Sequence, residues 1–133
     1  MSFLLDTNIC SAHLKRSSQL AHRFIQHSGR LYMPTIVLGE LYSWAHHRSN
    51  PVPLLRGIED GLLADIALLD YDQTCAKEFG RVRGALLQQG TPVSPVDLMI
   101  AAVALTHNLT LVTHNTKDYQ AIPDLRLADW LTP

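Results

Sequence analysis

The sequence lacks any long hydrophobic run. None of its apolar stretches approaches the roughly 18 residues that a helix needs to span a bilayer, so we expect no membrane partner. The N-terminus also lacks the basic segment and apolar core of a signal peptide, because Asp6 interrupts the short apolar stretch there. Together these absences favour a cytoplasmic protein.

Side chains that bind soft metals are scarce or poorly spaced. Cys10 and Cys75 are the only cysteines and lie far apart, which in the cytoplasm is more typical of reduced core residues than of a disulfide. There are seven histidines, but no pair has convincing ligand spacing. His46 and His47 are adjacent and would point about 100° apart on a helix. We therefore expect no zinc site.

An excess of basic residues is missing as well. Lys and Arg number 11 and Asp and Glu number 12, which gives a formal net charge of −1. Strong binding to phosphate groups usually comes with a clear excess of Lys and Arg. A nucleic-acid function would therefore have to depend on local patches or on bound metal ions.

What the sequence does contain is an alternation of short apolar segments with helical patterns. Strands are predicted at 2–6, 31–33, 66–69, 110–113 and 125–127. Helices are predicted at 7–15, 18–27, 36–48, 52–65, 75–89 and 94–107. This order, without repeats or a linker, predicts a single α/β domain over residues 1–133, with a central parallel sheet of four to five strands flanked by helices.

Local signals mark the starts of several helices. Thr7 or Asn8 can act as the N-cap of the first helix. Ser94 followed three residues later by Asp97 forms a variant of the capping box. Asp72 suits a helix cap and is therefore interpreted as structural.

One carboxylate stands where the fold places its ligands. Phe3-Leu4-Leu5 predicts a buried strand that ends at Asp6, and open α/β sheets bind ligands at the carboxyl ends of their strands. Three further acids are not obvious surface charges: Glu40 in a mostly apolar helix, Asp97 at the start of an apolar helix, and Asp118 after the strand at 110–113. We expect these acids to meet at one edge of the sheet.

Carboxylates that meet in this way repel one another. A pair 4 Å apart costs about 4 kcal/mol at an effective dielectric constant of 20, so the group must take up protons or bind a cation. Oxygen ligands favour Mg²⁺ or Mn²⁺. Such ions lower the pKa of a bound water and offset charge on phosphate oxygens. The acids therefore predict metal-dependent cleavage of phosphodiester bonds.

Each acid also has an ordinary structural interpretation. Asp6 can serve as a helix cap, Asp97 as part of a capping box, and Asp118 as a loop acid. Glu40 is harder to explain in this way, because its helix at 36–48 is apolar on most of its circumference and should be buried. A buried carboxylate costs free energy unless it is paired. The alternative for Glu40 is partial exposure.

Four stretches resemble a known family: LLDTNI, GELYSW, RVRGALLQQGTPVSPVDLMIAAVAL and LTLVTHNTKDY. Together they are similar to the PIN-domain family, and specifically to the VapC-type ribonucleases of bacterial toxin–antitoxin pairs. The resemblance covers nearly the whole chain. It implies a Mg²⁺- or Mn²⁺-dependent endoribonuclease that commonly dimerises and is held inactive by a small protein antitoxin.

The resemblance also assigns roles to residues. Metal-binding and catalytic carboxylates are implied at Asp6, Glu40, Asp97 and Asp118. The family uses either of two positions in its last motif, here Asn115 or Asp118. Polar supports around the metal and its water are implied at Thr7, Asn8, Thr113 and Asn115. Arg81 and Arg83 are candidates for contact with RNA phosphates, with a solvated helix face as the alternative.

Two positions depart from the family pattern without removing a carboxylate. Ser94 stands where relatives often have Gly, and His114 where Asn is common. Two other functions stay open: a PIN-like nuclease in RNA maturation or DNA cleavage, and a catalytically silent module that binds a partner. The presence of Asp6, Glu40 and Asp97 argues against the silent module.

Overall fold

The computed structural model describes residues 1–15 and 18–132. Five strands form one sheet in the order β3-β2-β1-β4-β5, and every neighbouring pair is parallel. The strands are β1 (Phe3–Leu5), β2 (Leu31–Pro34), β3 (Ala67–Leu69), β4 (Thr110–Val112) and β5 (Leu127–Ala128). The predicted α/β fold with a parallel sheet flanked by helices is confirmed, while the assignment of residues 1–133 to a single domain stays a prediction.

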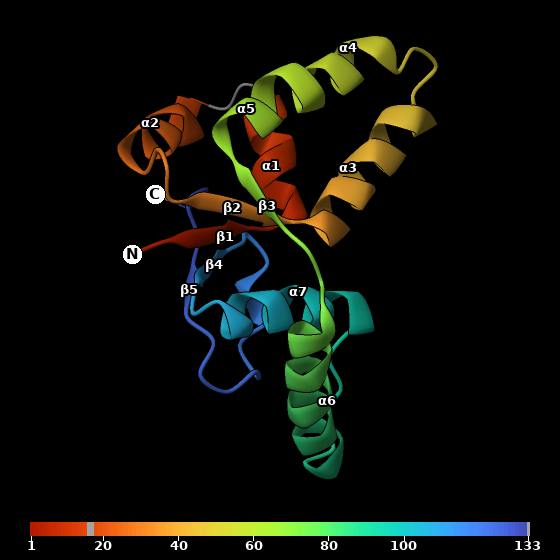
Figure 1. Ribbon diagram of the computed structural model, residues 1–133, viewed down its shortest axis with the longest axis vertical. Helices are drawn as coiled ribbons and strands as arrows, with labels where there is room; N and C mark the ends of the chain where they lie inside the picture. Colours follow the sequence, from red (N-terminus) through yellow and green to blue (C-terminus); the bar gives the residue numbers. More distant parts are fainter. Residues whose placement is uncertain (16–17, 133) are drawn as a thin grey trace.

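The helices lie on the two faces of this sheet (Figure 1). Those between the first three strands are α1 (Thr7–Leu14), α2 (Ser18–Gln26), α3 (Thr35–His47), α4 (Val52–Arg56) and α5 (Leu63–Asp65), and all lie on one side. On the other side lie α6 (Gln73–Gln88) and α7 (Pro95–Thr106), which pack against each other. No helix of the described residues is long and apolar enough to cross a membrane.

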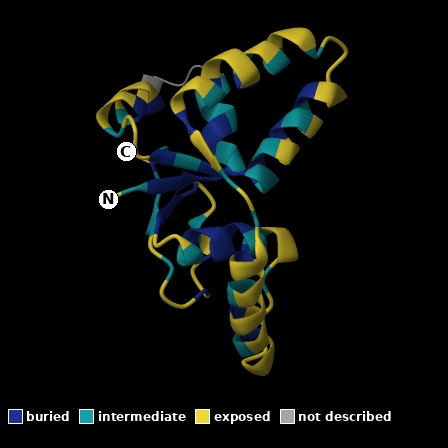
Figure 2. Cartoon of the chain, in the orientation of Figure 1, coloured by how far each residue is buried: buried dark blue, intermediate teal, exposed yellow. Residues whose placement is uncertain are grey.

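The core is centred on the two middle strands. All three residues of β1 and all three of β4 are buried, because helices cover both faces of the sheet. On the α6–α7 side, α7 is buried along most of its length, whereas α6 is mostly exposed (Figure 2). Cys10 and Cys75 are both buried and free, which confirms their prediction as reduced core residues.

The strand order identifies the edge at which a ligand would bind. The chain first builds β1, β2 and β3 to one side and then returns to place β4 on the other side of β1. The strand order reverses between β1 and β4, and the carboxyl ends of these two strands are the switch point where open α/β sheets hold their ligands in a crevice. Asp6 follows β1 directly at this point.

Two predictions about helices are wrong. The helix α3 buries only one stripe, Val37, Leu41 and Ala45, so the expectation that most of its circumference is buried fails. The segment predicted as one helix at 52–65 contains a π-helical stretch, η1 (Gly57–Leu62), between α4 and α5. A Cβ on Gly57 would lie 3.3 Å from Cδ2 of Leu14, so glycine allows α1 to approach closely here.

Candidate functional site

Asp6 uses its two carboxylate oxygens for different purposes. Oδ1 accepts a hydrogen bond from the backbone N–H of Thr7 at 2.8 Å, so Asp6 is the N-cap of α1 and the prediction of Thr7 or Asn8 in that role is wrong. Oδ2 accepts hydrogen bonds from the hydroxyls of Thr113, at 2.8 Å, and Tyr119, at 3.1 Å. Asp6 is buried, with 6% of its surface exposed. Helix capping therefore explains the hydrogen bond to Oδ1 of Asp6 but not the two hydrogen bonds to Oδ2.

Thr113 connects the ends of β1 and β4. Its fully buried hydroxyl donates to Asp6 and accepts from Nδ2 of Asn8, at 3.3 Å, and from the backbone N–H of Asn115, at 3.1 Å. Oδ1 of Asn8 in turn accepts from the backbone N–H of His114 at 2.9 Å. The structure thus brings Asn8, Thr113 and the backbone of Asn115 together around Asp6, while the Asn115 residue as a whole is exposed.

Asp97 lies at the start of α7 and faces the same hydroxyl as Asp6. The hydroxyl of Tyr119 donates to Oδ1 of Asp97 at 3.2 Å as well as to Asp6. Ser94 is the N-cap of α7, but its side chain makes no capping hydrogen bond, so the predicted capping box is absent. Asp97 is therefore available to the crevice, where the positive end of the helix dipole favours its negative charge by about 0.3–1 kcal/mol.

The pKa of Asp97 is raised by its surroundings in the site. Burial is the largest cause that raises this pKa above its ordinary value, and hydrogen bonding from Tyr119 opposes the rise. The negative charges of Asp6, Asp118 and Glu40 raise it further. The charges of the other three predicted carboxylates thus all act on Asp97.

Tyr119 is a member of the site that sequence reasoning missed. It is 1% exposed and follows the short 3₁₀ turn η2 (Thr116–Asp118), whose last bond runs from the N–H of Tyr119 to the carbonyl of Thr116. Burial first, and then the charge of Asp6, raises the pKa of Tyr119, so its hydroxyl stays a donor. A tyrosine at the end of LTLVTHNTKDY was the available signal, since a buried tyrosine hydroxyl needs a partner.

Glu40 lies at the exposed rim of the site. Its Oε1 accepts a hydrogen bond from the hydroxyl of Thr7 at 2.5 Å, which links α3 to α1. The argument that Glu40 is desolvated is wrong, because it lies about 100° around the helix from the buried Leu41 and is exposed. An exposed carboxylate near buried ones can still be reached by solvent and a large ligand.

Asp118, Arg81 and Arg83 make fewer contacts with the other predicted site residues. Asp118 is exposed on η2, and its charge acts on Asp97. Arg81 is paired with Glu78 one turn earlier on α6, and the guanidinium of Arg83 lies 6.0 Å from the ring centre of Phe79. Neither arginine bonds to a site residue within the described part of the chain. Their contact with RNA stays a prediction.

The donors suit a hard divalent cation. The side chains that hydrogen bonds bring together at Asp6 and Asp97 carry carboxylate and hydroxyl oxygens. Within residues 1–15 and 18–132, no three His, Cys, Asp or Glu side chains lie close enough together to hold an ion by themselves. Mg²⁺ usually keeps several waters and binds through one or two protein carboxylates, so the pair Asp6 and Asp97 fits it.

Comparison with protein families and curated sequences gives one consistent result. The family model described as "PIN domain" matches residues 3–125. The "tRNA(fMet)-specific endonuclease VapC" of Shigella flexneri is 37% identical over 131 residues, which cover 98% of each chain. "Ribonuclease VapC2" of Haemophilus influenzae is 32% identical over 132 residues, covering 98% of this chain and 99% of that protein.

Solved structures agree in fold. The DNA-bound VapBC of Salmonella typhimurium contains a chain with a TM-score of 0.91 and 34% identity, covering 98% of each chain. The VapBC2 of Rickettsia felis bound to a promoter DNA fragment contains one with a TM-score of 0.90 and 28% identity, covering 98% of this chain and 99% of that chain. These similarities extend over the sheet, both helical layers and the crevice that contains Asp6 and Asp97.

Proposed function

Because the chain belongs to the PIN-domain family, and within it to the VapC ribonucleases, we propose that it is an endoribonuclease toxin that hydrolyses RNA phosphodiester bonds at the Asp6–Asp97 crevice. The observation that carries this proposal is the convergence of two carboxylates from β1 and α7 on one buried hydroxyl at the switch point of the sheet. Two acids held at such a point suit a cation that faces a phosphate.

Divalent-metal dependence is the rule among ribonucleases of this family, and we propose Mg²⁺ or Mn²⁺ here. Asp6 and Asp97 would hold the ion, with Glu40 and Asp118 at the rim. When bound, it would supply an activated water and offset the charge of the scissile phosphate. Oxygen-only donors favour these two ions over zinc.

The chain's own residues prepare the site for this chemistry. Thr113 and Tyr119 donate to Asp6, which fixes the carboxylate and limits repulsion between it and Asp97. Thr7 holds Glu40 at the rim, where its carboxylate can accept a proton from an attacking water. Asn8 orients Thr113 and the backbone at His114. Asn115 contributes through its backbone N–H.

The substrate and partner follow from the relatives. The Shigella flexneri protein is named as specific for tRNA(fMet), so we propose a structured RNA such as an initiator tRNA as substrate. The Salmonella typhimurium and Rickettsia felis structures are VapBC complexes, which supports a small protein antitoxin as the partner. We also propose that the protein forms a homodimer and acts in the cytoplasm.

Incubation of the purified protein with tRNA(fMet) and Mg²⁺ tests the activity. We expect Asp97→Asn to slow cleavage at least about a hundredfold, the scale on which loss of one charge-stabilising group acts. Asp72→Asn is the control, because Asp72 is likewise an acid at the start of a helix, as the N-cap of α6, but lies outside the site. Equal cleavage by the wild type and Asp97→Asn would refute the proposal.

A further inference from the structure

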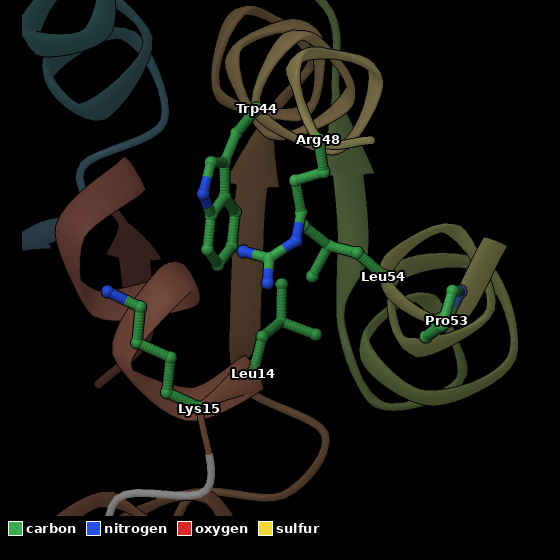
Figure 3. A pocket seen from close by; sticks show the side chains of 6 residues that line it. All are labelled: Leu14, Lys15, Trp44, Arg48, Pro53 and Leu54. Carbon is green, nitrogen blue, oxygen red and sulfur yellow. The ribbon is translucent and has the colours of Figure 1, made fainter. Parts of the chain in front are cut away.

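A pocket of about 360 Å³ opens between α1, α3 and α4 (Figure 3). It is lined by Leu14, Lys15, Trp44, Arg48, Pro53 and Leu54. Its floor is apolar, and Leu14 is held there by the close approach of Gly57 described above. None of the predicted site residues lines this pocket, so the family's carboxylate chemistry leaves it unexplained.

The pocket combines one large aromatic ring with two cations. Nζ of Lys15 lies 5.4 Å and Cζ of Arg48 lies 6.0 Å from the ring centre of Trp44. Both cationic residues are exposed, and neither belongs to an ion pair within the described residues. Trp44 itself is only partly buried, so an edge or face of its indole is accessible. Positive charge beside an accessible ring suits a ligand that is both anionic and flat.

The pocket and the carboxylate site share the helices α1 and α3. Trp44 follows Glu40 by four residues on α3, which puts them about one turn, roughly 5.4 Å of pitch, apart on the same helix face. On α1, Thr7 contacts Glu40, and Lys15 lies near Trp44 one helix length further on. A chain molecule that reaches the acids can therefore extend along α1 and α3 to the ring.

We propose that this pocket binds a nucleotide of the RNA substrate beyond the two that flank the cleaved bond. The base packs on Trp44 and the apolar floor, while Lys15 and Arg48 contact a phosphate. Stacking on aromatic side chains and cationic contacts are how proteins hold single-stranded RNA without reading its sequence. This inference rests on the proposed function, and it explains how a protein of net charge −1 gains local positive charge beside an acidic site.

Cleavage kinetics provide the first test. We expect Trp44→Leu to raise KM about tenfold for a single-stranded RNA of about 12 nucleotides and to change kcat little. For a dinucleotide, which does not extend to Trp44, kcat/KM should stay at the wild-type value. Failure of the wild type to cleave tRNA(fMet) with Mg²⁺ would refute the proposed function, whereas cleavage of the single-stranded RNA with no change in KM in Trp44→Leu would refute only the pocket.

The salt dependence of RNA binding tests the contribution of Lys15 and Arg48 separately from that of the Trp44 ring. The double variant Lys15→Gln/Arg48→Gln should reduce the slope of log affinity against log salt by about 0.7, because each neutralised phosphate of a single strand contributes about 0.7. Lys77→Gln is the matched control, since Lys77 is exposed on α6 across the sheet (Figure 1). An unchanged slope in the double variant would contradict the phosphate contact.

Fluorescence gives a readout that does not need cleavage. In the Asp97→Asn background, the same RNA should quench tryptophan emission, and an added Trp44→Phe change should remove this quenching because the remaining Trp130 is buried. Absence of quenching would refute stacking on Trp44. If Trp44→Leu instead weakened binding of a VapB-type antitoxin and left RNA binding unchanged, the pocket would belong to the protein partner and the proposal would be wrong.

Discussion

The hydroxyl of Tyr119 lies 3.2 Å from Oδ1 of Asp97, and the same hydroxyl lies 3.1 Å from Oδ2 of Asp6. One neutral donor therefore stands between two carboxylates that would otherwise repel each other. Burial raises the pKa of Tyr119, so the proton stays on the hydroxyl where both acids can use it. Tyr119 therefore links the two acids directly.

Replacing Tyr119 by Phe should lower the free energy of unfolding by about 1.5–3 kcal/mol, the usual cost of losing hydrogen bonds to charged groups. Urea denaturation measures this change, and isothermal titration with Mg²⁺ should show weaker binding because Asp6 and Asp97 lose their common partner. Tyr32→Phe is the control, since the hydroxyl of Tyr32 makes no hydrogen bond in the part of the chain that the structure describes. Equal effects of the two variants would contradict the positioning role.

Thr113 offers a second, independent test of how Asp6 is held. Thr113→Val keeps the shape of this fully buried side chain but removes the donor to Asp6 and the acceptor for Asn8 and the Asn115 N–H. We expect a loss of about 1.5–3 kcal/mol in unfolding free energy and slower RNA cleavage. Thr113→Ser keeps the hydroxyl and should restore cleavage, whereas a Ser variant as slow as Val would point to packing rather than hydrogen bonding.

Asp97 should destabilise the protein in the absence of divalent ions. Burial and neighbouring acids raise its pKa, so its ionised form is less favourable in the folded state than in the unfolded one. Asp97→Asn should therefore raise Tm slightly in EDTA, while Mg²⁺ should raise Tm of the wild type more than that of the variant. Thermal unfolding with and without Mg²⁺ measures both, with Asp72→Asn as control. The same Mg²⁺ response in both would exclude Asp97 as a ligand.

The sheet could be predicted because its signals are local. Each strand is a short apolar run beside a turn or helix signal, and strand ends place acids at one edge whatever the details of packing. Phe3–Leu5 and Thr110–Val112 were found within a residue or two in this way. The alternation of helices and strands then fixed the parallel topology.

The contacts inside the site could not be predicted, because they join residues far apart in the chain. The bonds from Tyr119 to Asp6 and from Thr7 to Glu40 depend on how η2 and α3 pack, and no local pattern encodes that. The interpretation of Glu40 as a buried carboxylate failed for a related reason. The apolar composition of α3 does not say which stripe of the helix faces the core. The pocket that Trp44 lines with two cations could not be predicted either, because its walls come from three different helices.

Stability should fall on mild acidification because of a partly buried histidine, His13. The ring of His13 stacks on Phe24 with 3.7 Å between centres, and burial, opposed by Asp65, lowers the pKa of His13 below its ordinary value of 6.5. The unfolded chain therefore takes up this proton first, so stability is greatest above pH 6.5 and declines as pH falls from there through the folded-state pKa. His13→Gln should flatten the decline of Tm over this range. His46→Gln, exposed on α3, serves as the control, and a decline unchanged in His13→Gln would show that other groups cause it.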